Sequence, residues 1–439
     1  MDKAAKNVAI ICKRFYLEVL FRELGLMGTS SNATYSKIDS PLQSLLKEHQ
    51  GLFSKCGIDK PTENQQKLPF MYWIPKFHKT PTKFRFIVAS FCCTSKPLSA
   101  ALTIALKEVQ RMSKLYCKRI QLSTGINQMW IADNSGAVLE TISHINRHSK
   151  AKTIATYDFS TLYTSIPHKA LKSALQGCIE RAFKGGAGKF LTVNGQFASW
   201  GSKPSSKRPS FSAEQLIQMT KTLIDNIFFT VGPAIFRQNI GIPMGTDCAP
   251  FLANLFLHFH EDRFISFKRS EKWRLCQLLS HNNRYIDDML VVNAGEMFDR
   301  VKDEIYPQEL VLNKENSEKD HAHFLDMDIS IIDGRFSVKL YDKRDSFPFK
   351  IVNFPHLNGN IPQRIGTSVL ISQLVRYSKC TLLLDFLKNA GKLFHKVRKQ
   401  FFSDHLIKTA VKRFLQNHFT LMAKYGFSRK ALSSLMLSS

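Results

Sequence analysis

A pair of adjacent aspartates inside an apolar segment constrains this chain more than any other feature. Residues 284–292 read RYIDDMLVV, so Asp287 and Asp288 interrupt a run of aromatic and aliphatic side chains that is typical of a buried strand pair. Burying an unpaired carboxylate is costly, and two neighbouring carboxylates also repel each other. A divalent cation bound by both would remove that cost. We therefore expect a metal-binding hairpin here, with a solvated acidic turn as the alternative.

A third aspartate follows another apolar strand. Residues 153–158 (TIATYD) predict a strand that ends at Asp158, followed by a turn and a helix that begins near Pro167. Free backbone N–H groups in such a turn can hold a phosphate beside a metal-bound carboxylate. The alternative is that Asp158 only caps the turn.

A basic turn precedes an apolar strand in the segment 68–88. Lys76, Lys79 and Lys83 crowd this turn, and Arg85 lies in the strand that follows. A guanidinium in an apolar strand needs a partner. Arg85 is therefore a candidate for bidentate phosphate binding or for a salt bridge to a local carboxylate.

Two glycines frame a turn that leads into a helix at residues 241–250 (GIPMGTDCAP). Small residues there would let a flat ligand such as a base pair approach the backbone, although the same pattern also occurs at ordinary helix starts. The Gly-, Ser-, Lys- and Pro-rich stretch 184–212 predicts a hairpin and loop insertion. Its GGAGK run lacks the glycine spacing and the hydroxyl residue of a phosphate-binding loop, so we reject that function for it.

Hydrophobic periodicity predicts a helix-rich chain with a second hairpin after the acidic one. The expected helices are 1–28, 41–52, 96–118, 134–148, 213–227, 249–264 and 296–304, followed by a basic helical region over 361–427. Strand 324–331 would turn at Asp333-Gly334 into strand 335–341. Asp326 and Asp328 would then share the solvent face of the first strand.

The charge balance indicates a polyanionic partner. Lys and Arg total 62 against 35 Asp and Glu, a net charge of +27, and the hydrophobic fraction of 44% indicates a globular chain. Nucleic acid is the commonest polyanion, with a merely basic surface as the alternative. Nine cysteines at irregular spacing, with no Cys-X-X-Cys pair, favour a reducing compartment over a disulfide framework or a zinc site. With no apolar run near ~18 residues and no signal-peptide pattern, we expect an intracellular protein of the nucleus or cytoplasm without a membrane partner.

In this order, the motifs resemble the palm of a reverse transcriptase. The sequence is most similar to that of Penelope-like retroelements in five segments: 157–164 (YDFSTLYT), 244–250 (MGTDCAP), 285–288 (YIDD), 324–326 (FLD) and 361–364 (IPQR). The resemblance implies an α+β right-hand polymerase with fingers, a palm built on an antiparallel sheet, and a helical thumb. No GIY-YIG endonuclease or RNase H region follows, so the resemblance is to a type that lacks the endonuclease.

The resemblance also implies a metal site. Asp158 and Asp287 would bind two Mg²⁺ ions, with Mn²⁺ as the alternative, and Asp288 would support the ion at the primer. One ion would activate the primer 3′-hydroxyl, and the other would neutralise the triphosphate.

Further implied roles concern the nucleotide, the template and the primer. Tyr163 would act as a gate whose ring excludes a ribose 2′-hydroxyl. The other implied contacts are Lys79, Arg85 and Lys314 with the triphosphate, Gly241, Met244 and Gly245 beside the template base, and Phe324, Leu325 and Asp326 in a grip on the primer.

Three regions are expected along the chain. They are an N-terminal helical extension (1–66), fingers and palm with the 184–212 insertion (67–335), and a thumb with a basic helical region (336–439). The expected activity is that of an RNA-directed DNA polymerase with an RNA template, a DNA primer and dNTPs as partners, in an oligomeric state that the sequence leaves open. The alternative from another class is a catalytically silent nucleic-acid-binding protein derived from such an enzyme. Tyr163 disfavours a third reading, an RNA polymerase on the same palm.

Overall fold

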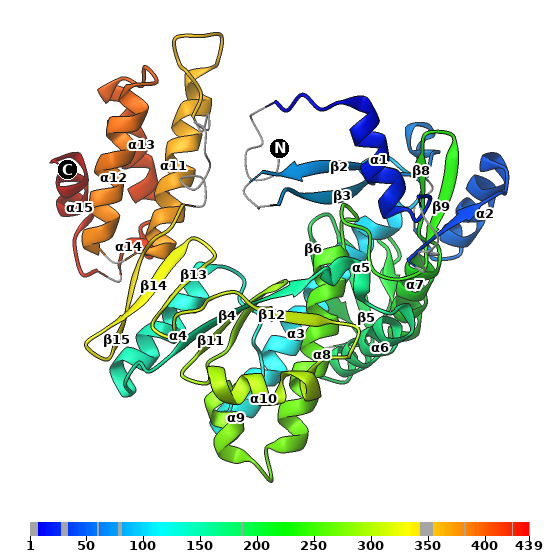
Figure 1. Cartoon of the computed structure of the whole chain (residues 1–439), viewed down its shortest axis with the longest axis horizontal. Helices are drawn as coiled ribbons and strands as arrows, with labels where there is room; N and C mark the ends of the chain where they lie inside the picture. Colours follow the sequence, from blue (N-terminus) through cyan, green and yellow to red (C-terminus); the bar gives the residue numbers. More distant parts are fainter. Residues whose placement is uncertain are drawn as a thin grey trace.

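A four-stranded antiparallel sheet stands at the centre of the fold, with a five-stranded sheet on one side and a bundle of C-terminal helices on the other (Figure 1). The computed structural model of this 439-residue chain describes residues 8–27, 34–58, 61–77, 81–185, 188–342, 354–381, 383–423 and 425–438. The expected mixture of helices and antiparallel sheets is confirmed.

The central sheet has the strand order β10, β11, β4, β12. These strands are β10 (Asn283–Tyr285), β11 (Asp288–Val292), β4 (Ile154–Ser160) and β12 (Val311–Lys314). Strand β4 continues two residues beyond Asp158, because its last residue, Ser160, still pairs with Val311. Asp158 therefore lies within the strand. The sequence-based expectation that the strand ends at Asp158 is wrong by two residues.

Both faces of this sheet are covered by apolar cores. Tyr157 and Met289 face one core, formed with the surrounding helices, whereas Ile154 and Leu290 face a second one. This double burial explains why β4 and β11 read as nearly continuous apolar runs.

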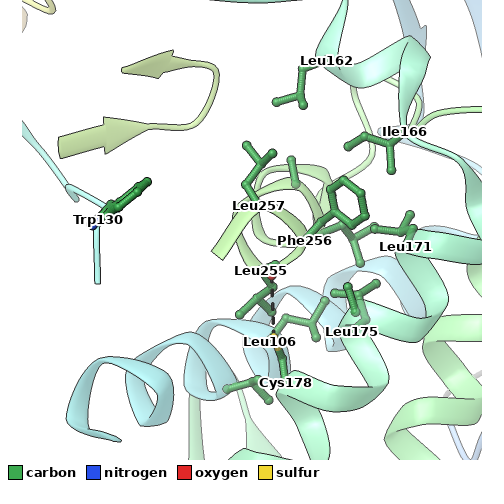
Figure 2. Close-up of a cluster of buried hydrophobic side chains, with 14 of the residues drawn as sticks. Leu106, Trp130, Leu162, Ile166, Leu171, Leu175, Cys178, Leu255, Phe256 and Leu257 are labelled. Atoms are coloured by element: carbon green, nitrogen blue, oxygen red, sulfur yellow. Dashed lines mark hydrogen bonds between the residues drawn. The ribbon is translucent and has the colours of Figure 1, made fainter. Parts of the chain in front are cut away.

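Helices of the first core pack around α8. They are α3 (Lys96–Thr124), α5 (Leu162–Ser165), α6 (His168–Gly185), α7 (Ala213–Asp225), α8 (Ala249–Lys268), α9 (Trp273–Leu279) and α10 (Gly295–Ile305). Helix α4 (Ser135–His148) belongs to the second core. Figure 2 shows Phe256 and its neighbours on α8 between Leu106 of α3 and Leu175 of α6. The Cys178 thiol donates to the Leu255 carbonyl across α6 and α8, at 3.6 Å.

The N-terminal segment belongs to the five-stranded sheet and is not a separate extension. The sheet has the order β1 (Tyr35–Ile38), β9 (Ala234–Gln238), β8 (Phe228–Val231), β2 (Phe70–Lys76) and β3 (Lys83–Ala89), and α1 (Lys13–Glu23), α2 (Leu42–Ser54) and the 3₁₀ turn η1 (Glu63–Gln65) accompany it. Tyr16 of α1 stacks on Trp73 with ring centroids 4.6 Å apart. Tyr35 of β1 is buried against Phe229, 5.6 Å away between centroids. These aromatic contacts attach α1 and β1 to the sheet.

The predicted insertion forms a small sheet of its own. Strands β5 (Phe190–Asn194), β6 (Phe197–Gly201) and β7 (Ser210–Phe211) form it, with β5 in the middle. The indole of Trp200 contacts Phe183 edge-on at 4.8 Å and donates to Glu108 of α3 at 2.7 Å. The insertion is therefore anchored to the helical core.

A third sheet connects the central sheet to the C-terminal helices. It contains β13 (His321–Phe324), β14 (Met327–Ile332) and β15 (Arg335–Leu340), and the expected turn at Asp333-Gly334 is confirmed, with φ angles of 49° and 70°. The predicted strand 324–331 is broken, because Leu325 has φ 55° and turns the chain. Asp326 therefore lies in a turn and does not share a strand face with Asp328.

The C-terminal region is helical, as predicted. It consists of α11 (Gln363–Cys380), α12 (Leu383–Arg398), α13 (Asp404–Asn417), α14 (Thr420–Ala423) and α15 (Arg429–Ser438). These helices share their own core, in which Phe386 and Phe414 are fully buried. The expected boundary at residue 336 falls inside β15, which completes the third sheet. Among the described helices, none combines the length and the apolar character that a membrane crossing requires.

Candidate active site

Two of the predicted aspartates lie directly opposite each other in the central sheet. Strands β4 and β11 are antiparallel neighbours, and Asp158 is the Cα partner of Asp288. Opposed residues in an antiparallel pair point to the same face, with Cβ atoms about 4.5–5.5 Å apart. Like charges in such a pair destabilise a sheet. The strand register therefore gathers negative charge at one point of the sheet.

Asp287 occupies the turn beside this pair. Ile286 and Asp287 form the two-residue connection of β10 and β11, and Ile286 has φ 57°. A β-branched residue at positive φ is an outlier that costs on the order of 1–3 kcal/mol and persists only where its surroundings enforce it. The backbone N–H of Phe159 donates to the Asp287 carbonyl at 3.1 Å, so the turn is tied to the neighbour of Asp158.

The enforcing contacts come from a buried arginine that the sequence analysis did not single out. Arg284 is fully buried, and its Nη1 donates to the Ile286 carbonyl at 3.0 Å and to Asn254 Oδ1 at 2.9 Å. Its Nη2 donates to Glu261 Oε2 at 3.2 Å, and Tyr306 donates to the other oxygen of that carboxylate at 2.9 Å. A signal was present in the sequence, since Asn254 and Glu261 stand seven residues apart in an apolar helix and so share one face.

Tyr163 and Arg85 lie close to the acidic turn. Burial raises the pKa of the Tyr163 phenol, and the negative charge of Asp287 raises it further, while the positive charge of Arg85 opposes the rise. Tyr163 comes from α5, and Arg85 comes from β3, where it pairs with Ile74 of β2. The fold thus brings together three side chains that are more than 70 residues apart in sequence.

The glycine turn 241–245 packs against both of these elements. A Cβ at Gly241 (φ 88°) would lie 2.3 Å from the Tyr163 carbonyl, and a Cβ at Gly245 (φ 120°) would lie 2.2 Å from the Val88 carbonyl. Val88 N–H donates to the half-buried Met244 at its carbonyl, at 2.7 Å. Protein backbone therefore occupies the Cβ side of each glycine, which leaves no room for a side chain there.

Lys314, which was expected at the triphosphate, does not join this group. Lys314 pairs with Tyr157 and so lies on the face away from Asp158, where its Nζ is 3.6 Å from Asp299 Oδ2 of α10. The β12 residue opposite Asp158 is Asn313. Lys79 lies outside the described residues.

The hairpin β13–β14, expected to grip a primer, opens to the same cleft as the acidic strands. Tyr285, Asp288, Leu325, Asp326 and Arg376 all line this cleft. Asp326 accepts two hydrogen bonds from the Arg376 guanidinium of α11, at 2.8 and 2.9 Å. Phe324 points into the core and is only 3% exposed.

The tightest groups of potential metal ligands in the described residues lie elsewhere. Two trios have ligand atoms all within 4.8 Å of one another: Cys117, His258 and Asp262, and His321, His323 and Asp328. Asp158, Asp287 and Asp288 do not form such a trio.

Comparison with known proteins identifies the fold but no family. No protein-family profile and no curated protein sequence matches this chain. Telomerase from Candida albicans, solved with a fragment of telomeric RNA, superposes with a TM-score of 0.50 at 14% identity, over 87% of this chain and 65% of that one. Apo telomerase from Candida tropicalis gives 0.44 at 13% identity over 92% and 68%, and the RNA-dependent RNA polymerase of a human picobirnavirus gives 0.43 at 11% over 98% and 77%.

The superposition on the Candida albicans telomerase carries the structural conclusion. Its identity is low enough that it bears on the fold alone, and this chain covers slightly less than two thirds of that protein. The chain has the α+β right-hand fold of nucleic-acid polymerases, with antiparallel sheets and a helical C-terminal region.

Proposed function

We propose that this chain is an RNA-directed DNA polymerase that transfers nucleotides from dNTPs to the 3′-hydroxyl of a DNA primer on an RNA template. The observation that carries the proposal is the register that sets Asp158 opposite Asp288, with Asp287 in the adjoining turn. Opposed carboxylates favour a ligand that is cationic. The polymerase fold and the net charge of +27 support a nucleic-acid partner.

The donor set fits Mg²⁺. Carboxylate oxygens are the ligands that this hard cation prefers, and it usually binds through one or two of them together with substrate phosphates. Asp158 and Asp287 would hold two ions, with Asp288 in support. When bound, the ions activate the primer hydroxyl and neutralise the triphosphate.

The chain's own residues supply positioning. Arg284 fixes the turn that carries Asp287 through its bond to the Ile286 carbonyl. Arg85, beside the site in β3, is a bidentate donor suited to phosphate oxygens. The raised pKa of Tyr163 keeps its phenol neutral, so its ring can lie near anionic groups without adding charge.

The amino-acid sequences of the motifs further support a retroelement enzyme of the Penelope-like type. The segments YDFSTLYT, MGTDCAP and YIDD lie on β4–α5, the glycine turn and β10–β11, the elements that meet at the proposed site.

Primer extension on an RNA template with dNTPs and Mg²⁺ tests the activity. We expect extension by the wild type and a loss of about a thousandfold or more in Asp158→Asn, because neutralising a ligand that acts at the transition state lowers kcat and kcat/KM together. Chelation of Mg²⁺ should abolish extension reversibly. A folded wild type that binds primer–template tightly but does not extend it would instead be a silent nucleic-acid-binding protein.

Sugar selection tests the role of Tyr163. We expect Tyr163→Val to raise the use of rNTPs relative to dNTPs by about tenfold or more, because the ring no longer opposes a 2′-hydroxyl. Tyr163→Phe keeps the ring and should keep the selectivity, which makes it the matched control. Preferential use of rNTPs by the wild type would favour an RNA polymerase.

A further inference from the structure

Two histidines and an aspartate converge on the outer face of the β13–β14 hairpin. His321 and His323 alternate with the buried Ala322 and Phe324, so both point away from the core. Asp328 is the partner of His323 on β14 and therefore shares this face. The three side chains are 31–42% exposed, so they are accessible to an ion from solvent.

One carboxylate oxygen lies within reach of both rings. Asp328 Oδ1 is 2.6 Å from His321 Nε2 and 3.2 Å from His323 Nδ1, and ligand atoms of all three residues lie within 4.8 Å of one another. A tetrahedral zinc with bonds of about 2.0–2.1 Å needs ligand atoms about 3.3 Å apart. Small rotations of these partly exposed side chains are enough to reach that spacing.

Neighbouring groups lie beside both rings. His323 stacks on Tyr341 with centroids 3.8 Å apart and an interplanar angle of 6°. His321 Nδ1 is 3.7 Å from Glu318 Oε2, so a small rotation would bring this carboxylate within hydrogen-bond distance, as an outer carboxylate is in many metal-binding histidines. Lys339 lies opposite Asp328 on β15, so a metal must compete with one cation for this carboxylate.

The other trio does not offer such a site. Cys117, His258 and Asp262 are all buried, and Arg181 already donates to Asp262 there. Burial also raises the pKa of the Cys117 thiol, which opposes the thiolate that a metal needs.

We propose that His321, His323 and Asp328 bind one transition-metal ion, with Zn²⁺ the best match to two imidazole nitrogens and one carboxylate oxygen, and with water as the fourth ligand. The ion would join β13 to β14 and stiffen the hairpin whose turn carries Leu325 and Asp326. The site is separate from the proposed Mg²⁺ site and does not depend on polymerase activity.

Cobalt and zinc titrations of the full chain test the proposal. With millimolar Mg²⁺ present to occupy hard carboxylate sites, we expect the wild type to bind a single equivalent of Co²⁺ with the visible absorption of a four-coordinate ion. Zn²⁺ should displace it and raise Tm. The absence of this absorption in folded wild-type protein would overturn the proposal without any variant.

Matched variants locate the site. His321→Ala with His323→Ala should abolish the absorption, and Asp328→Asn should weaken binding by about tenfold or more. His144→Ala with His148→Ala removes another close histidine pair, whose rings are 4.4 Å apart on α4, and should leave binding unchanged. Loss of binding in this second pair, with retention in the first, would contradict the proposal.

Discussion

The hairpins β10–β11 and β13–β14 each close with two residues, an aliphatic one at positive φ followed by an aspartate. In the first they are Ile286 (φ 57°) and Asp287, and in the second Leu325 (φ 55°) and Asp326. Positive φ at the first turn residue matches a type II′ turn, where glycine is usual. Both turns therefore hold an aliphatic residue in a backbone conformation that it avoids.

The arginine beside each turn is used differently. Arg376 donates two hydrogen bonds to the carboxylate of Asp326 and neutralises it. Arg284 instead donates to the backbone of Ile286 and pairs with Glu261 beneath the turn, while register sets Asp158 opposite Asp288. The comparison shows that one turn geometry can carry a structural aspartate or an acidic cluster, depending on where the neighbouring guanidinium points.

Neutralising the two turn aspartates in turn should distinguish the functions of the two turns most clearly. We expect Asp287→Asn to lower primer extension by about a thousandfold and to leave Tm unchanged or raised, because it removes repulsion between carboxylates. The isosteric Asp326→Asn should keep extension within about tenfold and lower Tm, since it removes an ion pair. Equal losses of extension in the two variants would show that the turns do not differ in function.

The arginine under the acidic turn should matter most for stability. Arg284→Met leaves Glu261 buried without its partner, which costs about 3–5 kcal/mol in the free energy of unfolding. Combining it with Glu261→Leu should restore much of that loss, because the buried charge is then gone. Denaturant unfolding measures both variants. An effect below about 1 kcal/mol in the single variant would mean that water reaches this pair.

The arginine beside the second turn should have the smallest effect. Arg376 and Asp326 are 22% and 42% exposed, so solvent screens the pair, and we expect Arg376→Ala to cost about 1 kcal/mol. A double-mutant cycle with Asp326→Ala isolates the interaction. A coupling energy near zero would leave the turn geometry, rather than the ion pair, as what fixes Asp326.

The sequence predicts the strands and helices around the site better than the contacts between them. The hairpin at 284–292 and the strand before Asp158 follow from apolar runs, and the Asp333-Gly334 turn follows from two residues suited to positive φ. The turn at Leu325 could not be predicted from the sequence, because an aliphatic residue is not typical of a turn. In addition, residues 324–331 (FLDMDISI) alternate between apolar and polar side chains as an unbroken strand does. Pairings between strands that are far apart in sequence, such as that of β1 with β9, could not be predicted either.

The site residues show the same limit. Asp158, Asp287 and Tyr163 could be identified from short sequence motifs. The sheet face on which Lys314 lies, in contrast, depends on its pairing with Tyr157. A shift by one residue would have put Lys314 beside Asp158. The His321–His323–Asp328 trio gives no signal of this kind, because Asp328 joins the two histidines only through the pairing of β14 with β13.

The hydrogen bond from Phe159 N–H to the Asp287 carbonyl has a consequence for how such a site can be moved or copied. It joins two strands that are more than 120 residues apart in sequence, through main-chain atoms that every amino acid possesses. Main-chain hydrogen bonds therefore set the spacing of the carboxylates, and the side chains supply the charge. A transplant of this arrangement into another sheet would need two neighbouring strands, one turn and the buried Arg284–Glu261 pair, and little of the surrounding sequence.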